Sequence, residues 1–161
     1  MTENELDRYM RQHYNSVYSV ALCCCKNPDD AYDISQEVFL KLYTCGATFT
    51  GEDHVKAWLL RCAVNKSRDF VRSHWYRFSQ PLDSAAEALT YTESRYEGYD
   101  LLPLIMKLKK DDRVALYLHY YEDYSVSELT ELLGISEAAL RSRLRRGRER
   151  LKKLIENERN E

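Results

Sequence analysis

One short segment near the C-terminus constrains the fold more than any other part of the chain. "SVSELTELLGISEAAL" opens with Ser125-x-x-Glu128, a capping box that predicts a helix starting at Val126. Gly134 then supplies a residue that adopts the left-handed conformation without steric cost, and Ser136 is a suitable N-cap for a second helix. Two capped helices joined by a glycine turn predict a helix-turn-helix.

The second of these helices separates apolar from basic side chains. At about 100° per residue, its core-facing arc holds Leu140, Leu144, Gly147, Leu151, Leu154 and Ile155. The basic residues lie on two flanks, with Arg141, Arg145, Arg148 and Lys152 on one and Arg143, Arg146, Arg150 and Lys153 on the other. Ala138 and Ser142 face outward between them. Small residues between arginines suit a helix in the DNA major groove, whereas the alternative is a solvated basic helix, or one that pairs with an acidic protein.

Charge elsewhere in the chain is also arranged in blocks. The formal net charge is -2, yet residues 138–153 hold eight basic side chains and one acidic one. Residues 54–80 form a second basic island, with six basic side chains and one acidic one. Local positive charge on an acidic background favours segments that meet a polyanion, and for the second island the alternative is an ordinary solvated face.

Helical spacing of apolar residues continues through most of the sequence, and no segment alternates as a strand does. We therefore expect an all-α protein of two small helical domains joined by a flexible linker, the C-terminal domain containing the helix-turn-helix. The predicted limits are 1–78 for the first domain, 79–99 for an acidic linker and 100–161 for the second domain. Predicted helices in the first domain cover about 6–24, 28–43 and 54–76, and Asp111 is a predicted cap in the second.

Two helices of the first domain carry polar faces of different kinds. On the helix near 54–76, a basic and amide row lies opposite the apolar arc, and it contains Arg61, Asn65, Arg68 and Arg72. Lys66 falls inside the apolar arc. On the helix near 28–43, Asp33, Gln36 and Glu37 surround Leu40 on the side away from the core, while Tyr43 falls on the side expected to be buried. A leucine ringed by acids and an amide is typical of an interface, although single exposed leucines are also common.

Other function classes find little support in the residues. The sequence lacks the phosphate-binding G-x-x-x-x-G-K-[ST], the G-x-S-x-G and the H-E-x-x-H motifs, so we expect no enzyme and no catalytic residue. The five cysteines show neither C-x-x-C spacing nor a Cys/His array, so we expect free thiols, no metal and no cofactor. With no run of about 20 apolar residues and no signal peptide, we expect a cytoplasmic protein without membrane insertion.

Three segments together resemble a known family. "DAYDISQEVFLKLY", "AWLLRCAVNKSRDFVR" and "YYEDYSVSELTELLGISEAALRSRLRRGRERLKKLI" are similar, in this order, to the extracytoplasmic-function group of bacterial sigma factors. The resemblance implies a transcription initiation factor that binds core RNA polymerase, melts the −10 element of a promoter and reads the −35 element. The alternative is a stand-alone helix-turn-helix regulator that does not join polymerase, which would leave the Leu40 face and the second basic island unexplained.

The resemblance also assigns roles to residues. Docking on the clamp helices of the polymerase would fall to Asp33, Gln36, Glu37 and Leu40. The loop from about Cys45 to Asp53 and the helix after it would read the −10 element, with DNA-binding residues Lys56, Arg61, Asn65, Lys66, Arg68 and Arg72. The C-terminal domain would sit on the polymerase flap and read the −35 element through Ser136, Glu137, Ala138, Arg141, Ser142, Arg143, Arg145 and Arg146. The linker would thread the polymerase channels, and an anti-sigma factor is a further candidate partner.

Some residues depart from the family pattern. Gly147 interrupts the basic helix where Ala is usual, at an expected cost of about 1 kcal/mol of helix stability. Thr130 occupies a site in the first helix of the helix-turn-helix where a small Ala is usual. The promoter sequence therefore does not follow from the resemblance.

Overall fold

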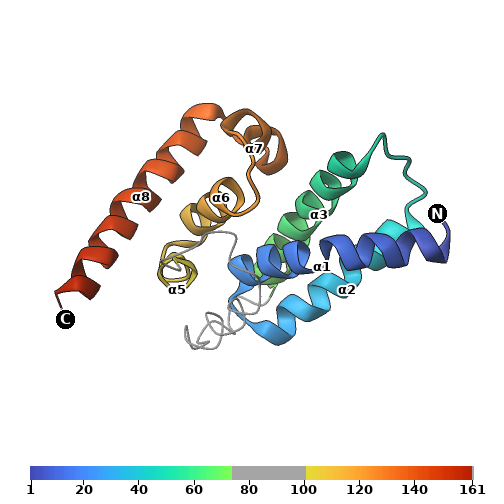
Figure 1. Cartoon of the computed structure of the whole chain (residues 1–161), viewed down its shortest axis with the longest axis horizontal. Coiled ribbons are helices and arrows are strands. Elements are labelled where there is room, and N and C mark those ends of the chain that lie inside the picture. The colour runs from blue at the N-terminus through green and yellow to red at the C-terminus, as the bar shows by residue number, and fades with distance from the viewer. Residues whose placement is uncertain (74–100, 161) are drawn as a thin grey trace. The chain divides into compact units, whose positions relative to one another are not determined.

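The computed structural model describes residues 1–73 and 101–160 of the chain, and every regular element within them is an α-helix. The chain divides into two compact units, Met1–Gln80 and Pro81–Glu161 (Figure 1). The predicted all-α class is confirmed. The predicted linker 79–99 lies outside the described residues, and the predicted domain limits stay predictions.

The first unit is a bundle of three helices: α1 (Glu3–Cys25), α2 (Pro28–Thr44) and α3 (Glu52–Ser73). Each of the three packs against the other two. Local signals set their starts, because Thr2 and Glu5 form a capping box on α1 and the side chain of Asn27 accepts a hydrogen bond from the Asp30 amide at the start of α2. Buried apolar side chains from all three helices form the core, among them Leu22, Leu42, Leu59 and Leu60.

The second unit contains α5 (Leu102–Ile105), α6 (Lys110–Tyr120), α7 (Val126–Leu133) and α8 (Glu137–Arg159). α8 packs against the other three helices, so it forms the spine of the unit. Its buried contacts come from Leu140, Leu144 and Gly147. Leu151, Leu154 and Ile155, predicted as core, are only half-buried. Leu151 and Ile155 line an open apolar groove, which explains the partial exposure of these two residues.

The start of α6 also differs from the prediction. Asp111 was expected to cap this helix, which would then begin at Asp112, but the helix begins two residues earlier, at Lys110. Lys109 occupies the cap position without a side-chain hydrogen bond. Asp111 and Asp112 lie in the first turn instead, where negative charge favours the positive end of the helix dipole. These two carboxylates face α8, as described below.

Candidate functional site

The helix-turn-helix forms as its local signals predict. The Ser125 hydroxyl accepts a hydrogen bond from the Glu128 amide, and the Glu128 carboxylate accepts one from the Ser125 amide. Gly134 ends α7 with φ of 66°, and the Ser136 hydroxyl caps α8 by accepting from the Ala139 amide at 3.1 Å. This arrangement leaves the outer face of the first turns of α8 exposed, including Glu137 and Ala138.

The arginines of α8 fall into two groups in the structure. Arg143 and Arg146 turn toward α6, where Arg143 lies 4.0 Å from Asp111 and Arg146 lies 3.3 Å from Asp112. The Arg143 side chain is only 19% exposed. Arg145, in contrast, is exposed, and it has no polar partner among residues 1–73 and 101–160.

Two further arginines of α8 are also engaged. Arg141 forms an ion pair of 2.7 Å with Glu137 one turn earlier, and Arg148 donates a hydrogen bond to the Tyr120 hydroxyl. Two other predicted −35 residues are serines near the start of α8: the cap residue Ser136 is exposed, and Ser142 in the second turn is half-buried. Of the arginines predicted to face DNA, Arg145 is therefore the one most ready to contact a ligand.

All six residues predicted to line the −10 DNA path lie on α3. Arg61, Asn65 and Arg72 are exposed, whereas Lys56, Lys66 and Arg68 are partly buried. Lys66 was predicted to fall on the apolar side, and its ammonium group reaches Glu37 of α2 at 3.5 Å. One predicted DNA contact is thus paired with one predicted polymerase contact.

The loop before α3 carries an aromatic cluster that the sequence reading did not identify. The Phe49 ring meets the rings of His54 and Trp58 edge-on, with centroids 5.2 and 5.8 Å apart. The Thr50 amide donates to Nδ1 of His54 at 3.1 Å. His54 and Trp58 stand four residues apart, on one face of a helix, and a phenylalanine in a polar loop is the signal that could have found the cluster.

The four residues predicted to contact polymerase lie together on the exposed face of α2. Asp33, Gln36 and Glu37 are exposed, and Leu40 is 62% exposed. The opposite face is buried, with Ala31, Ile34, Ser35, Val38, Phe39 and Leu42 in the core. Tyr43 was expected on the buried side, but it is 42% exposed, because it lies at the edge of the apolar arc and next to Thr44, the last residue of the helix. Tyr32, at 53% exposed, adds a second aromatic residue to this face.

The five cysteines all lie in the first unit and differ in burial. None of the five forms a disulfide, and Cys23, Cys24 and Cys62 are buried. Burial raises the pKa of the Cys25 thiol to about 12, so this group stays protonated near neutral pH. Within residues 1–73 and 101–160, no three His, Cys, Asp or Glu side chains gather as metal ligands would. None of the helices described is long and apolar enough to span a bilayer.

Comparison with protein families identifies the class. Residues 9–77 match the Sigma-70 region 2 family, and residues 100–151 match the Sigma-70 region 4 family. The chain is therefore an RNA polymerase sigma factor, a protein that directs promoter-specific transcription initiation. It belongs to the extracytoplasmic-function (ECF) subfamily of sigma factors, as its relatives show.

One such relative is the ECF RNA polymerase sigma factor SigM of Bacillus subtilis, which is 30% identical over 162 residues and is matched over 92% of this chain and 94% of its own length. SigM of Mycobacterium tuberculosis is 25% identical over 149 residues, with 92% and 76% covered. Among solved structures, the sigma factor RpoE in complex with the anti-sigma factor NepR from Bartonella quintana has a similar fold, with a TM-score of 0.70 at 18% identity, covering 94% of this chain and 97% of that one. CnrH in complex with the cytosolic domain of CnrY gives 0.68 at 22% identity, covering 97% and 90%.

Proposed function

We propose that the three exposed faces described above divide the work of a sigma factor. The α2 face around Leu40 docks on the clamp helices of core RNA polymerase. The loop of residues 45–51 and the basic row of α3 melt and read the −10 element, and the first turns of α8 read the −35 element. We also propose that the second unit contacts the polymerase flap, and we assign no residues to that contact.

The observation that carries the −35 assignment is the difference between Arg145 and its neighbours. Arg143 and Arg146 are occupied by the carboxylates of α6, so their charge is partly neutralised inside the domain. Arg145 projects from the same helix into solvent with its five donors unused within the described residues. A guanidinium in that position can form the two-point contact with guanine that is the commonest specific contact in the major groove.

The proposal also covers chemistry and location. A sigma factor recognises DNA and polymerase, while nucleotide addition belongs to the polymerase, so we propose that this chain has no catalytic activity of its own. Its action with polymerase on promoter DNA places it in the cytoplasm. Two structures of similar fold are complexes, one with the anti-sigma factor NepR and one with the cytosolic domain of CnrY, and by analogy we propose a protein inhibitor as a further partner.

Arg145→Ala tests the −35 assignment. The complex of the full chain with core polymerase should lose about 1–3 kcal/mol of affinity for a selected promoter, and preference at one base pair should relax. Binding would be measured by titration on the promoter and on a duplex with the −35 bases replaced. Arg145→Lys should restore little, because an ammonium group cannot form the two-point contact.

Arg150→Ala is the matched control, since Arg150 is an exposed arginine further along α8. It should weaken binding to both duplexes by the same small factor, as expected for contact with phosphate alone. An equal loss on both duplexes for Arg145→Ala would show that Arg145 also contacts only phosphate.

A further inference from the structure

The loop between α2 and α3 has few ties to the rest of its unit. Of its residues 45–51, only Phe49 is partly buried, and the other six are exposed. Phe49 and Thr50 contact the side chains of α3 that follow them, His54 and Trp58. The Val55 amide also donates to the Gly51 carbonyl at 3.2 Å. At the start of the loop, the Cys45 amide donates to the Lys41 carbonyl of α2 at 2.9 Å. The position of the second half of the loop, residues 49–51, therefore depends on where the first turn of α3 is held.

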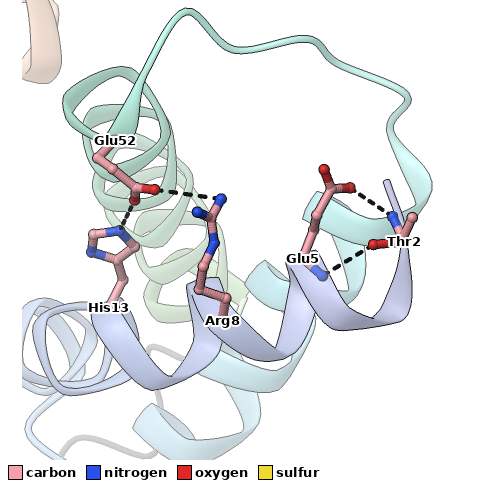
Figure 2. A network of polar contacts seen from close by, with 5 residues as sticks. All are labelled: Thr2, Glu5, Arg8, His13 and Glu52. Atoms are coloured by element: carbon pink, nitrogen blue, oxygen red, sulfur yellow. Dashed lines mark hydrogen bonds and ion pairs between the residues drawn. The ribbon is translucent and has the colours of Figure 1, made fainter.

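A single carboxylate in that first turn is held by α1. Figure 2 shows Glu52, the first residue of α3, pointing at Arg8 and His13. One Glu52 oxygen lies 3.5 Å from an Arg8 guanidinium nitrogen, and the other lies 3.4 Å from Nε2 of His13. Glu52 thus connects the start of α3 to α1, through a residue that lies 39 positions earlier in the chain.

The two α1 side chains are themselves arranged for this contact. The Arg8 guanidinium lies over the Tyr9 ring, 4.8 Å from its centroid, and the Tyr9 ring stacks on His13 with centroids 6.4 Å apart. The His13 side chain is only 11% exposed. Upstream, the Thr2–Glu5 capping box fixes the beginning of α1, as Figure 2 also shows. Arg8 and His13 therefore present an ordered cationic and hydrogen-bonding pair to Glu52.

We propose that Glu52 is a positioning residue for promoter opening: through Arg8 and His13 it fixes the first turn of α3, and with it the loop that meets the −10 element. This inference rests on the proposed function of that loop. Exposed ion pairs contribute little to folding, so loss of the contact should leave the bundle folded. The same small free energy can decide between positions of a loop that is exposed at six of its seven residues.

A simpler account would assign Glu52 only to the helix dipole. An acid in the first turn stabilises a helix wherever its side chain points. Asp53, the next residue, provides the same charge in the same turn, and it is exposed without a polar partner in the part of the chain that the structure describes. Glu52→Gln and Asp53→Asn therefore remove equal charge from one turn, and only the first breaks the contact with α1.

The first test uses the free full-length chain. Amide hydrogen exchange across residues 45–55 should become about threefold to tenfold faster in Glu52→Gln, because the weak contacts of Glu52 with Arg8 and His13 are lost. Asp53→Asn should leave these rates within about twofold of the wild type. Equal acceleration in both variants would reduce Glu52 to a helix-dipole residue and overturn the proposal.

The second test follows opening of a promoter selected from random-sequence DNA by the wild-type holoenzyme, with permanganate reactivity of unpaired thymines as the readout. Glu52→Gln should open it about threefold to tenfold more slowly, with binding to core polymerase unchanged. Arg8→Gln should slow opening too, and the double variant should be no slower than Glu52→Gln alone, because both changes break one contact.

The direction of the effect separates the alternatives. If Glu52 merely repelled DNA, Glu52→Gln would open the promoter faster, and that result, or an unchanged rate, would overturn the proposal. If the wild-type holoenzyme opened no promoter, the proposed function would fail, and the exchange rates of the free chain would still decide whether Glu52 positions the loop.

Discussion

Leu40→Asp is expected to abolish binding of this chain to core RNA polymerase while the first unit stays folded. Leu40 is 62% exposed, so the substitution removes little buried area from the bundle and should cost only the difference in helix propensity, a few tenths of a kcal/mol. In a docked complex the new carboxylate would be buried against an apolar contact without a partner, which costs several kcal/mol. Affinity should fall by about a hundredfold or more.

The measurement is a titration of labelled chain with core polymerase, alongside thermal unfolding of the free protein. Asn4→Asp is the control, because it adds the same charge at an exposed position in the first turn of α1. It should bind as the wild type does. If Leu40→Asp kept an affinity within about twofold of the wild type, the α2 face would not be the docking site.

Gly147→Val is expected to destabilise the second unit by about 3 kcal/mol. Gly147 is buried where α8 crosses α6, and a Cβ added there would lie 2.7 Å from Cδ1 and 3.0 Å from Cγ of Leu116. Leu116 is fully buried from solvent and lines the apolar groove beside α8, so its Cδ1 can shift, but its Cγ lies in the way as well. The two γ-methyl groups of valine would need still more space, so we expect them to push α6 and α8 apart, which would also pull Arg146 away from Asp112.

Gly147→Ala gives a finer test of the same contact. Alanine would add about 1 kcal/mol of helix propensity but would still press on Leu116, so the unfolding free energy should stay level or fall. Native-state hydrogen exchange of amides in α6 and α8 reports these changes. Glu149→Val, at an exposed position of α8, should cost only a few tenths of a kcal/mol. A gain of the full 1 kcal/mol in Gly147→Ala would contradict the close approach.

Gly147 shows which structural features could be predicted from the sequence alone and which could not. Its cost to the helix followed from propensity, but its purpose depends on the distance between α6 and α8, which no local pattern encodes. The caps at Ser125 and Ser136 and the left-handed Gly134 were predictable because each involves atoms within about four residues of one another.

In the candidate site too, local features were predictable from the sequence and long-range contacts were not. The exposed arc around Leu40 was predictable from helical spacing, since burial follows from which face is apolar. The engagement of Arg143 by Asp111, and of Glu52 by Arg8, joins residues far apart in the chain. Such contacts require the packed positions of two helices, so helical wheels placed Arg143 and Arg145 on opposite flanks without distinguishing their roles.

The most direct test of the whole account is transcription by core RNA polymerase with and without this chain. Purified chain and core polymerase would be passed over a sizing column, and the complex supplied with random-sequence DNA and nucleotides. We expect a stable complex whose transcripts begin downstream of a shared pair of sequence elements, and neither complex nor selected starts with Leu40→Asp. A chain that binds DNA yet forms no complex and selects no start sites would contradict the account and indicate a stand-alone regulator.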